Sequence, residues 1–424
     1  MSDRLVIQGG HKLEGHIGAS GAKNACLPLM AASILADGPV ELERVPNISD
    51  VRIMVNILKG LGVTVQDFCD GRMVFDSSTL NTTRAPEDLV VRMNASFDVL
   101  GPLLTRFGQG DVSLPGGCKL GPRPVNLHLD AMESLGAEIT KEGGFVKARA
   151  SRLKGCRIVF PLVSVGVTKN SMMAASMAEG TTVLENCARE PEIVDLADML
   201  NDMGARISGA GTSTLTIEGV DKLHGVKHTV ISDRIEAGTY LLAGAITQGD
   251  VCVENIRPDR LETFLNMLRK AGQEIIIDGN NIRVKGKRPI LPLAITTAPH
   301  PGFPTDLHPP MAALLSLAQG SSIINETIFG GRYMYVMELG RLGADILVNG
   351  QTARISGVPG FVGAPVDAPD IRAGGALVLA GLAAEGETVI RGVRYIDRGY
   401  QDLESRLTSL GADIKRVQAP LPAL

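Results

Sequence analysis

A cysteine and an arginine, Cys118 and Arg123, lie five positions apart in the segment LPGGCKLGPRP, residues 114–124. The glycines and prolines predict a loop, because both residue types interrupt helices and strands. Glycine lets the backbone approach a ligand, and proline limits the loop to a few shapes. Lys119 and Arg123 favour the thiolate form of Cys118 and attract an anion. The alternative is a surface turn whose cysteine only fills space.

Other charged residues precede predicted buried helices. Lys23 and Asn24 begin one such helix, where free backbone N–H groups attract anions; the alternative is a solvated lysine. Asp306 lies in FPTD, and Asp370 precedes Ile371 and Arg372. Each aspartate is either a reactive carboxylate or the N-cap of a helix.

Two further residues have competing interpretations. Arg398, in the segment IDRGY, either binds an anion or forms a surface salt bridge. His128, on a predicted helix, is more often a packed histidine than a catalyst.

Together these groups suit one kind of chemistry. Separate arginines favour a small anion with carboxylate and phosphate groups, since each guanidinium can bind one group in a bidentate manner. An aspartate can act as the base and a thiol as the acid of a proton transfer. The set consists of Lys23, Arg123, Arg372, Arg398, Asp306, Asp370 and Cys118.

Composition limits the class of protein. A chain of 424 residues predicts two domains of about 200 residues each. The net charge of -4 gives no footprint for nucleic acid or an anionic membrane. The six cysteines form no CxxC pair, so neither a disulfide framework nor a zinc site is indicated. The first residues do not have the layout of a signal peptide, and the apolar run 373–384 is too short to cross a membrane, so we expect a cytoplasmic protein.

The chain contains a repeat of about 70 residues, defined by two interleaved glycine series. The first series ends small-apolar, helix-like stretches before short strands: Gly38, Gly110, Gly180, Gly249, Gly320 and Gly386. The second series closes amphipathic segments: Gly62, Gly136, Gly204, Gly272, Gly343 and Gly411. Leu, Met or Ala precedes each glycine of the second series, which predicts helices that end at a left-handed glycine. Each unit reads as helix, strand, helix, strands, and segments 22–35 and 373–384 should be buried helices surrounded by sheet.

The motifs of the chain resemble one family over nearly its whole length. The segments SGAKNACLP, ASFDVLGPLL, RFGQGDVSLPGGCKLGPRPVNLHL, ENCAREPEIVD, DRIEAGT, TAPHPGFPTD, DIRAG and YIDRGYQDLESRLTSLGA are similar to successive motifs of the UDP-N-acetylglucosamine enolpyruvyl transferases. The resemblance implies an α/β fold of two inside-out α/β barrels with three repeat units each and the active site between them. The N-terminal catalytic domain would span residues 23–231, with the Cys118 loop. Residues 1–22 and 232–424 would form the C-terminal catalytic domain.

The resemblance also implies an activity. Phosphoenolpyruvate would give its enolpyruvyl group to the 3-hydroxyl of UDP-N-acetylglucosamine by addition and elimination, with release of phosphate, in the first committed step of peptidoglycan synthesis. No metal or organic cofactor would be required. The two substrates are the expected partners, with no nucleic acid or membrane, and the chain would be a monomer or a weak homo-oligomer.

Roles carry over to individual residues by the same resemblance. Cys118 would be a general acid that also assists product release, Asp306 would take the proton of the sugar hydroxyl, and Asp370 would help proton transfer at the methylene carbon. Lys23, Arg123 and Arg398 would bind the phosphate of phosphoenolpyruvate, and Arg372 and Arg398 its carboxylate. The residues that would line UDP-N-acetylglucosamine are Asn24, Arg123, Pro124, Val125, Asn126, Leu127, His128, Ser164, Val165, Gly166, Asp306 and Ile328.

Four positions depart from the family pattern. Asn94 stands where arginine is usual, Asn126 where aspartate is usual, Leu162 where lysine is usual and Gly330 where glutamate is frequent. Two alternatives therefore stay open: the same chemistry on another nucleotide sugar, or a catalytically weak paralogue that binds the sugar nucleotide as a regulator.

The Cys118 loop yields the first prediction. A small epoxide that mimics phosphoenolpyruvate should label Cys118 before the other cysteines, because nearby cations lower the pKa of its thiol. Cys26, Cys187 and Cys252 lie in apolar or strand-like runs and should react slowly. Mass-spectrometric mapping after limited treatment measures the order, and even labelling would contradict it. A Cys118→Asp variant should keep turnover and resist the epoxide, since a carboxylic acid donates a proton but is a poor nucleophile.

Overall fold

The computed structural model describes residues 3–114 and 125–418. The chain forms two compact units. The N-terminal unit holds residues 21–114 and 125–231, and the C-terminal unit holds residues 3–20 and 232–418. Cys118, Lys119, Arg123 and Pro124 lie outside the described residues.

The N-terminal unit contains three copies of the predicted helix–strand–helix–strands order. The first is α1 (Lys23–Ala32), β4 (Val40–Glu43), α2 (Ser49–Gly60), β5 (Thr64–Asp67) and β6 (Met73–Asp76). The second is α4 (Leu100–Phe107), β7 (Gln109–Ser113), α5 (Val125–Ser134), β8 (Glu138–Glu142) and β9 (Phe145–Arg149). The third is α6 (Val165–Ala175), β11 (Thr181–Glu185), α7 (Pro191–Asp202), β12 (Arg206–Ser208) and β13 (Thr214–Glu218). Shorter connecting elements are η1 (Ser33–Leu35), β3 (Ala36–Asp37), η2 (Ser77–Thr79), α3 (Glu87–Val90), η3 (Asn94–Val99), β10 (Arg157–Val159), β14 (Leu223–His224) and β15 (Lys227–Thr229).

The C-terminal unit repeats the same order. Its first copy is α8 (Arg234–Ile246), β16 (Asp250–Glu254), α9 (Glu262–Lys270), β17 (Glu274–Asp278) and β18 (Asn281–Lys285). The second is α10 (His308–Leu315), β20 (Ser321–Asn325), α11 (Tyr335–Arg341), β21 (Asp345–Asn349) and β22 (Thr352–Ser356). The third is α12 (Ile371–Ala383), β26 (Glu387–Arg391), α14 (Leu403–Thr408) and β27 (Asp413–Val417). The remaining elements are β1 (Arg4–Gln8), β2 (Glu14–Gly18), η4 (Pro258–Leu261), β19 (Ala294–Thr296), η5 (Thr305–Leu307), β23 (Phe361–Val362), β24 (Pro365–Asp367), β25 (Ala384–Glu385) and α13 (Val393–Ile396).

The sheets follow a shared pattern in which the two strands after an amphipathic helix pair antiparallel. The N-terminal unit has sheets β15-β4-β6-β5, β7-β9-β8 and β10-β11-β13-β12, with the small pair β14-β3. The C-terminal unit has sheets β17-β18-β16-β2, β19-β20-β22-β21 and β24-β26-β1-β27, with the small pair β23-β25. The last repeat is completed by β1, which pairs antiparallel with both β26 and β27. The N-terminal strand thus supplies the position that a following strand fills in the other repeats.

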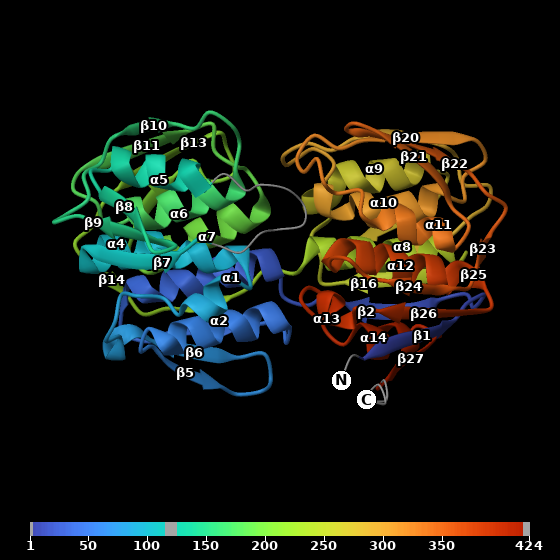
Figure 1. Ribbon diagram of the computed structural model, residues 1–424, viewed down its shortest axis with the longest axis horizontal. Helices are drawn as coiled ribbons and strands as arrows, with labels where there is room; N and C mark the ends of the chain where they lie inside the picture. Colours follow the sequence, from blue (N-terminus) through green and yellow to red (C-terminus); the bar gives the residue numbers. More distant parts are fainter. Residues whose placement is uncertain (1–2, 115–124, 419–424) are drawn as a thin grey trace. The chain divides into compact units, whose positions relative to one another are not determined.

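In the C-terminal unit three apolar helices, α8, α10 and α12, pack on one another at the centre of the core. Figure 1 shows them between the sheet of β20, β21 and β22 and the sheet of β1, β26 and β27. Helix α12 is apolar on all sides, and its side chains from Arg372 to Leu382 are buried. A helix with no polar face must be covered all round, and the sheets supply that cover. The prediction of buried helices over 22–35 and 373–384 is confirmed.

The glycine series explain how the repeats turn. All six glycines of the second series have positive φ, between 88° and 105°, so the predicted left-handed helix ends are confirmed. The first series is less regular. At the second repeat the left-handed residue is Gly108, at the C-cap of α4, whereas Gly110 lies inside β7. The side chains of Leu100 and Leu103 approach Gly110 closely, so close packing and not a turn accounts for that glycine.

These observations predict opposite effects for two substitutions three residues apart. Gly343→Ala should lower the free energy of unfolding by about 1–2 kcal/mol, because its φ is 97° while nothing lies within 4 Å of an added Cβ. Gly340→Ala, inside α11 and equally open, should raise it by about 0.5–1 kcal/mol. Urea unfolding followed by circular dichroism measures both values. Equal effects of the two variants would show that backbone conformation is not the cause.

Candidate active site

One carboxylate and two arginines form the charged centre of the C-terminal unit. Asp306 lies in η5, and its Oδ1 accepts from Arg332 Nη1 at 2.6 Å. Its Oδ2 accepts from Arg372 Nη2, in the first turn of α12, at 2.9 Å. Both arginine side chains are almost fully buried. The N-cap residues of η5 and α10 are Pro304 and Leu307, so the N-cap interpretation of Asp306 is wrong.

The two arginines determine the charge of Asp306. Burial by itself would raise the pKa of this carboxyl, but the charges of Arg372 and Arg332 outweigh it and hold the pKa well below the usual value. Asp306 is therefore a carboxylate at neutral pH. It is also a weak base for as long as both guanidinium groups remain paired with it.

The N-terminus of α12 orders Arg372. Asp370 Oδ1 accepts from the backbone N–H groups of Arg372 at 2.8 Å and Ala373 at 3.0 Å, so its helix-cap interpretation is confirmed. The guanidinium of Arg372 lies 5.6 Å from the centre of the Tyr400 ring. Tyr400 follows Arg398 by two residues, just beyond α13, and Arg398 is half-buried. The structure thus brings Asp306, Asp370, Arg372 and the segment of Arg398 into one region of the C-terminal unit.

In the N-terminal unit the predicted lysine is paired. Lys23, the first residue of α1, forms an ion pair with Asp50 in the first turn of α2, with Nζ–Oδ2 at 2.7 Å. Both side chains are at least nine-tenths buried, so the interpretation of Lys23 as a solvated lysine is wrong. Asn24 follows in the same helix and is half-buried.

The segments predicted to line the nucleotide meet at two helix N-termini. His128 lies in the first turn of α5, which begins at Val125. Its ring packs against Gly166, so a Cβ added at Gly166 would lie 3.2 Å from His128 Nε2. Ser164 caps α6 through an Oγ that accepts from Val167 N. Residues 125–128 and 164–166 are therefore neighbours, with Asn126 exposed and Leu127 buried.

His128 is a packed residue, as expected. Its ring contacts Phe97 edge-on, with centroids 5.3 Å apart, and its Nδ1 lies 3.1 Å from Asn170 Nδ2. Burial, with a smaller effect of Lys169, lowers the pKa of His128 to about 3, so the imidazole is neutral.

The sequence did not single out Arg332 or Asp50. Arg332 follows two glycines, and nothing in a turn of that composition distinguishes a buried, paired arginine from a surface one. Asp50 has the position of an ordinary acidic residue in a helix first turn. Both are identified only by their buried partners, Asp306 and Lys23, which lie more than 25 residues away.

Two of the four positions that depart from the family pattern, Leu162 and Gly330, lie in open surroundings. Leu162 has 47% of its surface exposed, and nothing lies within 4 Å of a Cβ added at Gly330. Asn94 begins η3 and is half-buried. A larger or charged side chain would fit at positions 162 and 330, so packing does not impose these departures.

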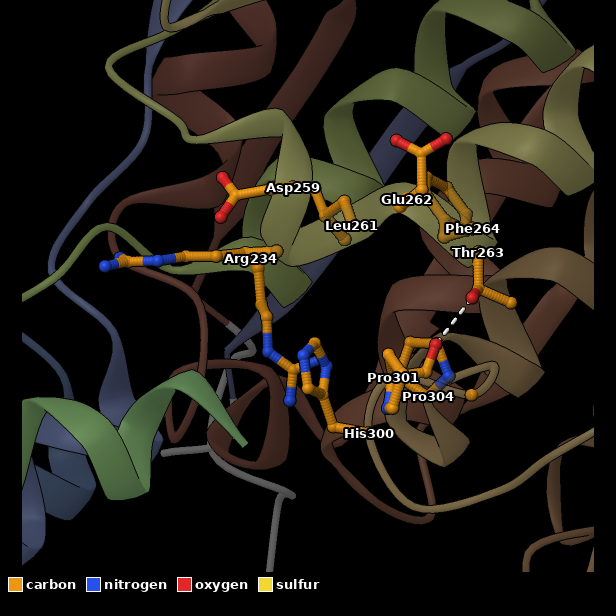
Figure 2. Close-up of a pocket in the computed structure, with 11 residues that line it drawn as sticks. Arg234, Asp259, Leu261, Glu262, Thr263, Phe264, His300, Pro301 and Pro304 are labelled. Atoms are coloured by element: carbon orange, nitrogen blue, oxygen red, sulfur yellow. Dashed lines mark hydrogen bonds between the residues drawn. The ribbon is translucent and has the colours of Figure 1, made fainter. Parts of the chain in front are cut away.

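One surface hollow lies close to the turn that carries Asp306. This small hollow lies beside η5, lined by Arg234, Glu262, His300 and Pro304 among others (Figure 2). A hydrogen bond from Thr263 Oγ1 to Pro301 O, 2.5 Å long, lies at one side of the hollow. Asp306 is not among the residues that line the hollow.

Across residues 3–114 and 125–418, no cluster of three or more His, Cys, Asp or Glu side chains is arranged to hold a metal ion. In the same ranges no helix has the length and apolar character to cross a membrane.

The comparisons with known proteins define the class. A family model described as EPSP synthase (3-phosphoshikimate 1-carboxyvinyltransferase) matches residues 7–407. The fold is similar to that of the enolpyruvyl transferase NikO from Streptomyces tendae, with a TM-score of 0.88 and 28% identity over 99% of this chain and 100% of that chain. An EPSP synthase from Acinetobacter baumannii shares the fold at a TM-score of 0.76 and 19% identity, over 99% of this chain and 100% of that chain. The chain therefore belongs to the EPSP synthase family of enolpyruvyl transferases.

Closer relatives narrow the assignment. The chain is 52% identical to the UDP-N-acetylglucosamine 1-carboxyvinyltransferase of Azorhizobium caulinodans, over 98% of this chain and 99% of that protein. It is 50% identical to the protein of the same name from Geobacter metallireducens, over 98% of this chain and 100% of that protein. Within the EPSP synthase family, the chain is thus a member of the UDP-N-acetylglucosamine 1-carboxyvinyltransferases, and the resemblance found in the motifs is confirmed.

The ion pairs of Asp306 lead to a prediction about pH. Asp306→Asn should lower the free energy of unfolding at pH 7 by about 3 kcal/mol, because it leaves two buried guanidinium groups without their carboxylate. The folded-state pKa of Asp306 is depressed, so its stabilisation is complete above about pH 4, the usual aspartate pKa, and is lost as the pH falls further. The difference between variant and wild type should therefore shrink below about pH 4.

Urea unfolding at pH 7, 5 and 3 measures this difference. Asp367→Asn, which breaks an exposed pair with Arg391, is the matched control and should cost less than about 1 kcal/mol. A difference for Asp306→Asn that stays constant on acidification would show that the ion pairs are not its source.

Proposed function

We propose that this chain catalyses transfer of the enolpyruvyl group of phosphoenolpyruvate to the 3-hydroxyl of UDP-N-acetylglucosamine, with release of phosphate. The observation that carries the proposal is the Asp306–Arg332–Arg372 cluster in a chain about half identical to proteins named for this activity. The cluster supplies one carboxylate for a proton and two guanidinium groups for an anion. The product would enter peptidoglycan synthesis, in the cytoplasm.

The reaction proceeds by addition and elimination. A proton adds to C3 of phosphoenolpyruvate while the sugar hydroxyl oxygen attacks C2, and Asp306 takes the hydroxyl proton. The resulting tetrahedral adduct then breaks its bond to the phosphate oxygen, and loss of a proton from the new methyl group restores the double bond. Cys118 donates a proton as the general acid, and Asp370 assists proton transfer at the methylene carbon.

The binding roles in this proposal are those that the family resemblance implies. Lys23, Arg123 and Arg398 hold the phosphate of phosphoenolpyruvate, and Arg372 with Arg398 holds its carboxylate. Arg372 is well suited to this role, because the Asp370 cap and Tyr400 order it before any ligand arrives. The sugar nucleotide is held by the neighbouring helix starts at 125–128 and 164–166, together with Asn24, Asp306 and Ile328.

The two compact units correspond, in this proposal, to the N-terminal and C-terminal catalytic domains, each an inside-out barrel of three repeats. The phosphate ligand Lys23 belongs to one unit, and the carboxylate ligand Arg372 belongs to the other.

A phosphate-release assay tests the proposal. Phosphoenolpyruvate with UDP-N-acetylglucosamine should release phosphate, and phosphoenolpyruvate alone should not. Parallel reactions with other UDP-sugars address the departures at Asn94, Asn126 and Leu162. Release only with another sugar would change the acceptor, and no release with any sugar would favour a regulatory binding protein. Asp306→Asn should lower kcat by about 100-fold or more if this carboxylate is the base.

A further inference from the structure

The second carboxylate of this region is Glu326, which follows β20 directly in the chain and is fully buried. Five donors converge on it. Oε2 accepts from Thr305 Oγ1 at 2.8 Å and from His308 Nδ1 at 2.9 Å. Oε1 accepts from Thr297 Oγ1, Ile328 N and Phe329 N at 2.9, 2.8 and 3.0 Å. These bonds keep Glu326 ionised: burial would raise its pKa, but the donors, His308 first, lower it to about 2.

Two of the donors are close neighbours of Asp306 in the sequence. Thr305 immediately precedes Asp306, and His308 follows it by two residues. The short turn η5 is thus fixed on both sides of Asp306 by a single carboxylate oxygen. A 3₁₀ turn of three residues has few hydrogen bonds of its own, so side-chain anchors decide its orientation.

The other oxygen orders the partner of Asp306. It binds the N–H groups of Ile328 and Phe329, which begin the turn that leads to Arg332. Phe329 makes two contacts with Arg332. Its carbonyl oxygen accepts a hydrogen bond from Arg332 N at 3.0 Å, and the centre of its ring lies 4.9 Å from the guanidinium carbon. Both members of the Asp306–Arg332 ion pair are therefore tied to the same carboxylate.

A histidine and a tyrosine extend the arrangement into the core. His308 Nε2 lies 2.8 Å from Tyr335 Oη, and both side chains are buried. Burial lowers the pKa of His308 and raises that of Tyr335, so the imidazole is neutral and the phenol keeps its proton. The phenol donates to Nε2, and Nδ1–H donates to Glu326, which fixes one tautomer. Figure 1 shows the elements involved, α10, β20 and α11, in the same part of the C-terminal unit.

We propose that Glu326, with His308, is a positioning residue that fixes the geometry of Asp306 relative to Arg332. It does not touch the reacting atoms. It acts by orienting the carboxylate that accepts the hydroxyl proton and the guanidinium that is paired with that carboxylate. This inference rests on the proposed function for its catalytic consequence, whereas the geometry itself is independent of it.

Glu326→Gln is the direct test. The amide is close in shape but carries a donor where the carboxylate has an acceptor, so at least one of the five bonds must be lost or reversed. We expect kcat to fall about 10- to 100-fold, because a base displaced by a fraction of an ångström loses its alignment, while KM for both substrates changes less than about three-fold. ¹⁵N spectra of the histidines should show His308 changing from the Nδ1–H tautomer.

Two control variants separate positioning from general damage. Asp195→Asn alters another buried carboxylate–histidine pair, with His228 at 3.0 Å, in the N-terminal unit. It should lose comparable thermal stability but keep kcat within about two-fold. Tyr335→Phe removes only the outer hydrogen bond, so kcat should stay within about three-fold.

Three outcomes would overturn the proposal. One is a Glu326→Gln enzyme with kcat within two-fold of wild type. Another is equal kcat losses in the Glu326→Gln and Asp195→Asn variants, and the third is a Tyr335→Phe loss as large as that of Glu326→Gln. If wild type releases no phosphate, the proposed function fails on its own, and a crystal structure of the Glu326→Gln variant still decides the geometry. An Asp306 Oδ1–Arg332 Nη1 distance longer than about 3.5 Å in that variant supports the positioning role, and an unchanged distance refutes it.

Discussion

Two buried guanidinium groups share one carboxylate in the C-terminal unit, and the local structure around them depends on that sharing. An arginine removed from water is costly unless a negative charge and hydrogen bonds compensate it. Asp306 compensates both Arg332 and Arg372, one with each oxygen. Three separate parts of the chain must therefore meet at fixed distances: the turn η5, the segment after Phe329 and the first turn of α12. The buried helices of the core provide the rigid frame in which they meet.

Much of the fold follows from the sequence because the signals are local. A left-handed glycine at the end of a helix needs only its own backbone, and all six glycines of the second series behave as predicted. Helices apolar on every side are equally recognisable, since such a pattern has no stable exposed form. The misassigned Gly110 illustrates the limit. It lies within β7, where the side chains of Leu100 and Leu103 leave an added Cβ only tight contacts, a constraint that no local pattern contains.

The candidate site was predictable to a smaller extent, for the same physical reason. Asp306, Asp370 and Arg372 stand out because each adjoins a buried helix, where charge is unusual. Their partners do not stand out. Asp50, Glu326 and Arg332 are ordinary charged residues in the sequence, and only tertiary contacts bury them. Asp370 shows the opposite ambiguity, because a helix cap and a proton-transfer group have the same sequence signature; the structure demonstrates the cap.

The charges around Asp306 also connect its stability to the proposed chemistry. Asp306 is the carboxylate partner of both Arg332 and Arg372. These two ion pairs make Asp306 a weak base, because both arginines depress its pKa. In the proposed reaction, a substrate carboxylate that pairs with Arg372 would add a negative charge and weaken the ion pair between Arg372 and Asp306. The pKa of Asp306 would then rise, and the carboxylate would gain basicity with the anionic substrate in place. As proposed above, the hydrogen bonds of Glu326 would keep Arg332 and the turn η5 in position during this change, so that the charges around Asp306 change while its geometry is kept.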